Sequence, residues 1–441
     1  MPYSASPLSG LSLVLSSILL FLSIVYTELA ISGIAIPAFL ILQWAIIAFG
    51  TTLRNNELRR SFKEVVRPIV ITYAIFSLCF GISLWANGSF TEDFRFYISL
   101  VLQIMWFPIV YKLVANRELK IIKIIEVTVA FCVFYLTLIW LAAVVSSIDI
   151  FTLRNSSSLI TRGEIEFLPE IFTNANRLAR CAFLLLCLVM FIEIVSPKER
   201  KRLWFYCKAL LSLLIICSLS RATIMAWIIL ICFVGFKSMR HSSNHRLIPT
   251  GFPLYVVSFF LIIVLLSAVV PEVGERIDSI FSRISQTQAA ISANEVVLED
   301  NSLRSRTWAA SVLIIRDNLF NGVGVSSSFD EMIRYGAIAF KGGEEVGLWV
   351  HGGFLKIALY AGLIALVPFL FFLGYCAKKM LDSHKGMQGR RFHLSAIPKL
   401  GIVYILCLIP INIGADYFGY SGTWLLMALL VSFSAKYRHG L

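Results

Sequence analysis

The stretch Arg304-Ser305-Arg306-Thr307-Trp308, followed by Asn321-Gly322-Val323-Gly324, lies in the only long polar segment of this chain. That segment leaves an apolar run at Val270 and enters the next one at His351-Gly352-Gly353-Phe354. Apolar runs of about 15 to 24 residues recur on both sides of it, close to the length that crosses a bilayer. The sequence therefore predicts a membrane protein with one large loop, placed late in the chain between two spans.

The composition supports this fold class. Hydrophobic residues make up 58% of the chain, and the mean hydropathy of +0.81 lies far outside the range of soluble globular proteins. The apolar runs are continuous rather than alternating, which excludes a membrane barrel and predicts an all-α polytopic protein. The first run lacks a preceding basic region, so we expect it to be retained as a span. The nine cysteines lie in apolar runs or at their ends, and we expect no disulfide framework.

The net charge of +13 comes mostly from short basic loops between the apolar runs. Such loops mark the cytoplasmic side of a membrane protein, so we expect membrane lipids and no nucleic acid as partners. We predict cytoplasmic loops at 54–67, 117–123 and 378–399, among others. The loop at 87–94 contains no lysine or arginine and is predicted to lie on the opposite, external side.

The apolar runs indicate about twelve transmembrane helices. Spans one to nine occupy residues 1–270, the large loop 271–350, and the last three spans 351–441. The sixth span starts near Asn174, and the seventh and eighth form a tight hairpin with Ser218-Leu219-Ser220-Arg221 at its tip. Both termini are then cytoplasmic and the large loop is external. The remaining predicted spans are 10–27, 33–53, 68–86, 95–114, 124–146, 253–270, 351–374, 400–413 and 422–434.

The external side is rich in arginine but has only one lysine in its loops, Lys341. The positive-inside rule counts lysine and arginine alike, so this bias needs another cause. A guanidinium group can hold phosphate through two parallel hydrogen bonds. Arg177, Arg180 and Arg221 lie at span edges, where they either snorkel to lipid headgroups or hold a lipid pyrophosphate. The external arginines are Arg154, Arg162, Arg177, Arg180, Arg221, Arg276, Arg283, Arg304, Arg306, Arg316 and Arg334.

Residues 302–318 of the large loop are predicted to form an amphipathic helix. Trp308, Val312 and Ile315 recur at helical spacing, and Arg304 lies one turn before Trp308 on the same face. Arg306 is about 200° from Trp308, so we expect it to point away, either solvated or paired with an acid such as Glu299 or Asp300. The glycines of 321–324 most simply turn the chain.

His351 is the only external histidine, and it stands where the tenth span begins. The positive end of a helix and partial burial both disfavour the charged ring, which keeps it neutral, as a general base must be. A purely structural histidine is the alternative, and Glu344 and Glu345 are rival bases. The sequence has no DxD or Walker motif, and a transferase that uses arginines and one base needs no metal.

These residues resemble the bacterial O-antigen ligase and O-antigen polymerase superfamily. Members have about twelve spans, a large late loop with an arginine–tryptophan helix leading to a Gly-x-Gly turn, and a histidine that opens the next span. The resemblance covers roughly residues 170 to 375 and includes Ser220-Arg221, Asn174-Ala175-Asn176-Arg177 and Tyr360-Ala361-Gly362. His351-Gly352-Gly353 departs from the family's commoner histidine–asparagine start. That departure puts the details of acceptor contact in doubt.

The resemblance implies a glycosyltransferase C-like fold in the bacterial inner membrane, with a large helical loop and an active site facing the periplasm. It implies an inverting transfer of glycan from undecaprenyl pyrophosphate to the lipid A-core oligosaccharide, without a metal. His351, Arg221 and Arg304 would be catalytic, and Arg177, Arg180, Arg306 and Asp416 would bind the substrates. Two alternatives remain: an O-antigen or exopolysaccharide polymerase, and a transporter that binds the lipid-linked glycan without chemistry.

Overall fold

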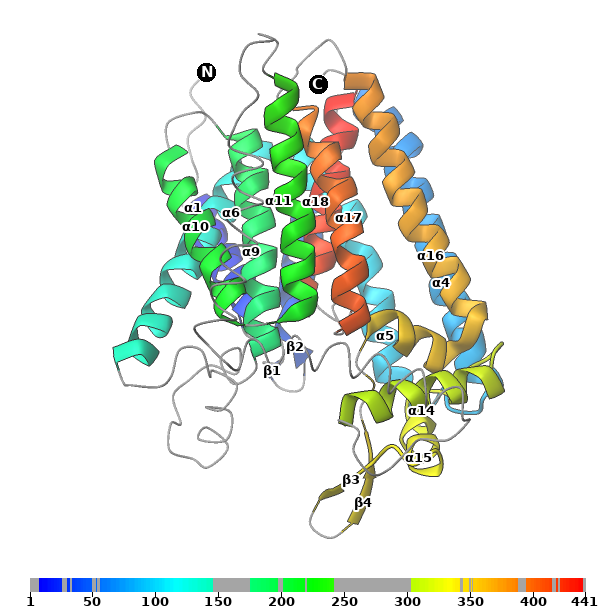
Figure 1. The fold of residues 1–441 in the computed structure, drawn as a ribbon. Helices are drawn as coiled ribbons and strands as arrows, with labels where there is room; N and C mark the ends of the chain where they lie inside the picture. The colour runs from blue at the N-terminus through cyan, green and yellow to red at the C-terminus, as the bar shows by residue number, and fades with distance from the viewer. Residues whose placement is uncertain are drawn as a thin grey trace, which may run out of the picture. The chain divides into compact units, whose positions relative to one another are not determined.

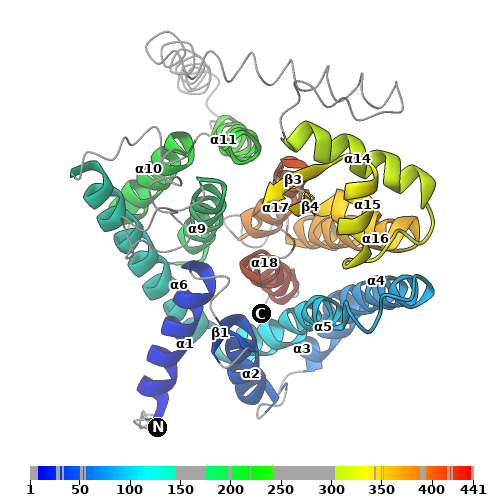
Figure 2. The ribbon, with the colours of Figure 1, turned by 90° about the horizontal axis from the view of Figure 1, so that it is seen from below.

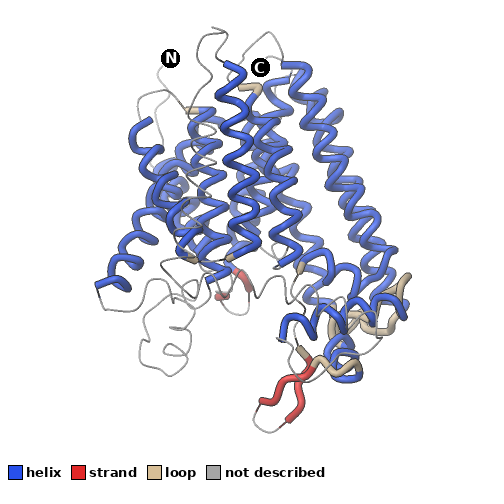
Figure 3. Tube along the Cα trace, in the orientation of Figure 1, coloured by secondary structure: helices blue, strands red, loops and turns tan. Residues whose placement is uncertain are grey.

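The computed structural model is dominated by helices (Figure 1, Figure 3). By contact, the chain divides into two compact units. The first unit comprises Met1–Leu78, Phe96–Trp227 and Pro368–Leu441, and the second comprises Cys79–Arg95 and Ile228–Val367. The structure describes residues 8–25, 30–31, 34–49, 53, 56–145, 175–196, 201–218, 220–241, 303–341, 344–348, 350, 352–387, 394–414, 418 and 421–438.

The elements follow one another in a largely helical order. The helices are α1 (Leu8–Val25), α2 (Ile36–Phe49), α3 (Asn56–Ser61), η1 (Phe62–Val66), α4 (Arg67–Ala86), α5 (Phe94–Leu102), η2 (Gln103–Met105), α6 (Trp106–Val145), α9 (Ala175–Val195), α10 (Lys201–Cys217), α11 (Arg221–His241), α14 (Leu303–Asp317), α15 (Ser327–Arg334), α16 (Gly353–Met387), α17 (Ala396–Gly414) and α18 (Ser421–Arg438). The strands are β1 (Ala30–Ile31), β2 (Ile34–Ala35), β3 (Ile338–Lys341) and β4 (Glu344–Gly347).

The strands form two antiparallel pairs that the all-α prediction did not include (Figure 3). β1 pairs with β2, and β3 pairs with β4 in a register that places Ile338 opposite Gly347. The second pair lies in the large loop, which is therefore not wholly helical. The Gly342-Gly343 sequence between its strands is of the kind that two-residue hairpin turns favour.

Helices occur at every predicted span except the ninth, 253–270, which lies outside the described residues. Five described helical segments are long and apolar enough to cross a membrane: Asn56–Ala86, Phe96–Leu138, Arg177–Val195, Gly353–Met387 and Ala396–Ile413. The chain is therefore a multi-pass membrane protein. Eight cysteines in the described part carry free thiols.

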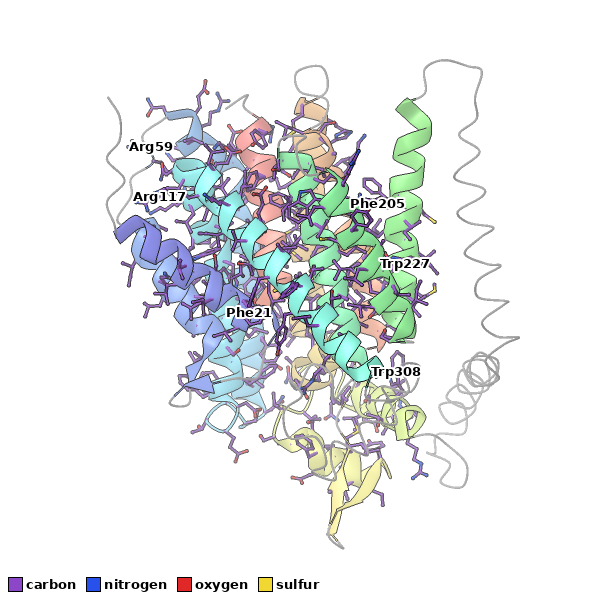
Figure 4. All side chains as sticks on the ribbon, turned by 90° about the vertical axis from the view of Figure 1, so that its left-hand side faces the viewer. Phe21, Arg59, Arg117, Phe205, Trp227 and Trp308 are labelled. Carbon is purple, nitrogen blue, oxygen red and sulfur yellow. The ribbon has the colours of Figure 1, made fainter. Side chains whose placement is uncertain are left out.

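The fourth and fifth predicted spans are joined without an intervening loop. Arg117 has non-helical backbone angles, φ −141° and ψ 37°, and divides α6 into two helices. The 43 residues of Phe96–Leu138 are about twice the length that one crossing needs, and the break at Arg117 restores two crossings. Figure 4 shows Arg59 and Arg117 near the same end of the first unit.

Three basic segments predicted as loops are largely helical instead. α3 and η1 occupy 56–66, α6 resumes directly after Arg117, and α16 continues to Met387. A helix satisfies its own backbone hydrogen bonds wherever it leaves the lipid, and long basic side chains can reach water from its flanks. His384 and Lys385 in the last turn of α16 also oppose the negative end of its dipole.

Helix α18 forms the core of the first unit. Its residues from Gly422 to Ala435 are all buried, and Figure 2 shows it surrounded by other helices of this unit. At its C-terminal end Lys436 and Tyr437 bind the carboxylate of Glu118, and Ser61 donates a 2.8 Å hydrogen bond to the carbonyl of Ala435. Three segments predicted to be cytoplasmic thus meet at one end of this unit.

Candidate functional site

The hairpin tip between α10 and α11 lies where the sequence predicted it. Ser218, Ser220 and Thr223 are buried there. The Ser220 hydroxyl lies 3.1 Å from that of Thr223, and the Ser220 amide donates to the Ser218 hydroxyl at 3.3 Å. These contacts fix the start of α11, whose first residue is Arg221. The positive end of this helix therefore coincides with a guanidinium-bearing residue, an arrangement that favours an anion.

Arg177 and Arg180 lie in the first turns of α9, also in the first unit. Both side chains are half-buried and both have interaction partners. Their neighbours Leu178, Ala179 and Cys181 are buried. These two arginines are thus built into the start of α9 rather than freely solvated. The first unit holds three of the predicted site arginines, each at a helix N-terminal end.

In the second unit, α14 matches the predicted helix to within one residue at each end. Its orientation differs from the prediction. The buried residues of α14 are Thr307, Ala309, Ala310, Ser311, Leu313 and Ile314, whereas Trp308 is only half-buried. At about 100° per residue, these positions form a broad face directed mostly away from Trp308, not the face that the sequence predicted. Alanine and serine are small, so this face can approach its neighbours closely.

Of the two alternatives predicted for Arg306, solvated or paired with an acid, the structure does not support the solvated one. The Arg306 side chain is half-buried, and its Nε atom is shielded from solvent without an acceptor among the described residues. Glu299 and Asp300, its expected partners, lie outside those residues. A shielded donor without an acceptor is costly, and for a guanidinium group an anion is the natural partner. Arg304 belongs to the same helix, and its side chain lies outside the described part.

The turn after α14 fills a break in α16. Gly362 has φ 63° and ψ −165°, which interrupts α16 after Ala361. The amides of Val323 and Gly324 donate to the carbonyls of Leu359 and Tyr360 at 2.8 and 2.9 Å. In return, the amides of Leu363 and Ile364 donate to the carbonyls of Leu319 and Phe320 at 2.9 and 3.3 Å. The backbone groups that the break frees are thus satisfied by the turn.

This pairing leaves no room for side chains at two glycines. A Cβ atom on Gly362 would overlap the carbonyl of Phe320, and one on Gly322 would stand 2.5 Å from the carbonyl oxygen of Leu359. The conformation of Gly362 is also one that essentially only glycine adopts. Gly322 of the Gly-x-Gly turn and Gly362 of Tyr360-Ala361-Gly362 therefore both have a structural role, because their lack of a side chain lets the turn pack directly against the break in α16.

The loop at 87–93, predicted to be external, holds the same turn from the other side. The carbonyl of Asn321 accepts hydrogen bonds from the Ser83 hydroxyl and from the side-chain amide of Asn87, the latter at 2.8 Å. Both oxygens of Asp93, which is buried, accept backbone amides at the start of α15: Val325 at 2.6 Å and Ser326 at 2.9 Å. Sequence reasoning missed these three residues because their partners lie more than 230 positions away.

Replacing Asp93 with asparagine is expected to destabilise the second unit by about 1–2 kcal/mol. An amide has only one acceptor oxygen, so one of the two backbone donors loses its partner and the charge at the start of α15 is lost. The measurement is the thermal unfolding midpoint of purified protein in lipid nanodiscs. The exposed neighbour Glu92, changed to glutamine, is the matched control, and equal midpoints for the two variants would contradict the capping role.

Two of the arginines predicted to be external have local partners and need no substrate. Arg316 lies 3.0 Å from Asp317, and Arg334 lies 3.5 Å from Glu331. The pKa of Asp317 lies below its ordinary value because Tyr335 and then Arg316 donate hydrogen bonds to its carboxylate. These contacts tie the ends of α14 and α15 together. The arginines that remain for a substrate are accordingly fewer than the sequence suggested.

His351 and Asp416 lie outside the described residues, as do the side chains of Arg221, Glu344 and Glu345. The residues beside His351 are described: Val350 is buried, and the carbonyl of Gly352 accepts the Lys356 amide at 2.9 Å as α16 begins. In the sequence, His351 is thus two residues before the segment of α16, Gly353–Ala361, that precedes the break held by the turn at 319–324. Within the described part of the chain, no three His, Cys, Asp or Glu side chains gather as metal ligands would.

The first unit therefore contains the predicted site residues Arg177, Arg180 and Arg221, and the second contains Arg304 and Arg306. Residues 206–370 match the protein family described as O-antigen ligase. This range includes Arg221, Arg304, Arg306 and His351 but not Arg177, Arg180 or Asp416. No curated protein matches the chain. The matched region contains the arginine helix and the glycine turn that docks against α16, so this part of the chain is similar to the O-antigen ligase family.

Proposed function

We propose that this protein transfers O-antigen glycan from undecaprenyl pyrophosphate to the sugar core of lipid A. The observation that carries the proposal is the family match over 206–370, which includes His351 and three of the predicted site arginines. Transfer would occur at the periplasmic face of the bacterial inner membrane, where both substrates are anchored by lipid. The fold would be of the glycosyltransferase C type.

The chemistry is a single displacement at the anomeric carbon. His351 takes the proton from an acceptor hydroxyl, and the oxygen attacks the anomeric carbon from the face opposite the pyrophosphate. The new glycosidic bond forms as the bond to the pyrophosphate oxygen breaks, with inversion of configuration. Undecaprenyl pyrophosphate leaves with the bonding electron pair, and the proton stays on the imidazole until it is released to solvent.

The arginines supply the charge that a metal ion supplies in other transferases. Negative charge grows on the pyrophosphate as the bond breaks, and Arg221 and Arg304 stabilise it. Arg306 adds a contact to the anion, which is supported by its shielded Nε atom without an acceptor in the described structure. Arg177 and Arg180 support the lipid phosphate, and Asp416 contacts acceptor hydroxyls. Glu344 and Glu345 remain the rival bases.

A polymerase would use the same residues and differ only in its acceptor, a glycan still attached to its lipid carrier. A transporter would bind the pyrophosphate and move the lipid without breaking a bond. The test is to mix purified protein with lipid-linked O-antigen, with lipid A-core in one tube and no added acceptor in another. Glycan on lipid A-core supports the ligase, and longer lipid-linked glycan without that acceptor supports the polymerase.

No transfer in either tube, under conditions in which a known ligase is active, would overturn the proposal and favour the transporter. Adding a chelator is expected to leave the yield unchanged, because the arginines rather than a metal stabilise the leaving group. Loss of transfer with chelator, restored by a divalent cation, would contradict that part of the mechanism.

A further inference from the structure

Helix α4 carries a stripe of exposed apolar side chains that ends in a tryptophan. Ile71, Ile75, Leu78, Ile82 and Trp85 are all exposed, and Trp85 is 75% exposed. They recur at intervals of three and four residues and so share one face of the helix. Because α4 lies in the span Asn56–Ala86, this face is the lipid-contacting surface. Trp85 stands at its end, where tryptophan prefers the membrane–water interface.

The turn after α14 is held at the same level as Trp85. Its Asn321 carbonyl accepts hydrogen bonds from Ser83 and Asn87, which lie two residues before and two residues after Trp85. At a rise of about 1.5 Å per residue, those donors are within about 3 Å of Trp85 along the axis of α4. The depth of the turn is therefore set by the membrane end of a spanning helix.

The same turn presents two apolar side chains outwards. Phe320 is 68% exposed and Leu319 is 40% exposed, although the backbone of both residues is hydrogen-bonded to α16. Their carbonyls are occupied by the amides of Leu363 and Ile364, so the backbone is fixed while the side chains point away from it. A rigid turn that displays Leu-Phe at the level of an interfacial tryptophan is suited to contact lipid. Phe94, 47% exposed, adds another aromatic ring to the second unit's surface.

We infer that the Leu319–Phe320 turn is a membrane-interface anchor, which inserts the Phe320 ring at the boundary between lipid headgroups and acyl chains. The occupant is the bilayer itself, because the turn is hydrogen-bonded to the C-terminal end of α4 and to residues 359–364 of α16, and both helices are long and apolar enough to cross a membrane. The anchor holds α14 and α15 against the membrane surface. It does not depend on which glycan, if any, the protein transfers.

The test is site-specific photo-crosslinking of full-length protein in nanodiscs of phosphatidylethanolamine and phosphatidylglycerol. The photoreactive residue benzoylphenylalanine replaces Phe320, Trp85 or Asp330 in separate variants, and adducts are identified by mass spectrometry. All three side chains are exposed, so the replacement does not disturb packing. Phe320→benzoylphenylalanine and the Trp85 variant are expected to form lipid adducts, and the Asp330 variant on α15 is not.

Each other outcome would overturn the anchor. Lipid adducts at position 85 but not at 320 would show that the turn is in water, and adducts between two copies of the chain at 320 would show a protein contact. Lipid adducts of equal yield at 320 and 330 would show unspecific labelling rather than an anchor. Thermal unfolding of the three variants verifies that each is folded before illumination.

Discussion

Replacing Gly362 with alanine is expected to destabilise the protein by about 3 kcal/mol or more. Two costs combine: the backbone conformation at φ 63° and ψ −165° excludes side chains, and the new methyl group overlaps the Phe320 carbonyl. Either α16 straightens and expels the turn at 319–324, or the turn is held under strain. The measurement is the unfolding midpoint in nanodiscs, together with protease cleavage in the 319–337 region.

The same helix offers a matched control. Gly374 has no heavy atom within 4 Å of an added Cβ, so Gly374→Ala should be neutral or stabilise α16 by about 0.5–1 kcal/mol. Protease resistance and a wild-type midpoint in Gly362→Ala would contradict the broken helix. A lower unfolding midpoint in both glycine variants would mean that α16 as a whole tolerates no substitution. The docking of the turn would then not explain the result.

Replacing Arg221 with lysine is expected to lower kcat/KM for glycan transfer by about 10²-fold. Lysine keeps the positive charge but loses the planar fork that holds two phosphate oxygens. Loss of one stabilising donor at a developing anion costs about this much in other enzymes. The buried serines of the hairpin tip stay in place, so the change acts on the side chain and not on the start of α11. The measurement is initial rate against donor concentration.

Arg316→Lys is the control for that substitution, since Arg316 is exposed and bound to Asp317. We expect wild-type kinetics there. Wild-type kinetics in Arg221→Lys as well would remove Arg221 from the pyrophosphate site. A rise in KM with unchanged kcat would mean that Arg221 holds the substrate without stabilising the charge that develops during the reaction.

The membrane-crossing helices could be predicted because their apolar runs are local and long. Helix α14 and the hairpin tip at Ser218–Arg221 were also predictable, since spacing and polar interruptions mark them directly in the sequence. The basic segments at 56–66 and 118–123 were predicted as loops because charge was taken to end a helix. In a membrane protein, charge ends the lipid contact, while the helix can continue.

The break in α16 could not be predicted from its own sequence. A single glycine in an apolar run is usually tolerated in a helix, and the interruption at Gly362 depends on a turn some 40 residues earlier, at Leu319 to Gly324. Likewise, the sequence around Asp93 resembles that of an ordinary loop, and its contact with the start of α15 is evident only from the structure. The β3–β4 hairpin, by contrast, could have been predicted, because the sequence contains Gly342-Gly343, which is typical of two-residue hairpin turns.

The orientation of α14 needed its packing partners as well. Periodicity favoured burial of the Trp308 face. The face that is buried instead includes the small residues Ala310 and Ser311, which allow closer contact with neighbouring elements. In this orientation Arg306, predicted to be either solvated or paired with an acid, is half-buried with a shielded Nε. Composition and position in the sequence therefore identify candidate arginines for the site, but they do not rank them.

The most direct test of His351 as the catalytic base is single-turnover transfer to lipid A-core by wild-type protein and by His351→Ala, Glu344→Gln and Glu345→Gln. We expect His351→Ala to be slower by about 10²–10⁴-fold with unchanged unfolding midpoint, and the two glutamine variants to match wild type. A wild-type rate in His351→Ala, or a comparable loss in either glutamine variant, would contradict His351 as the base that activates the acceptor.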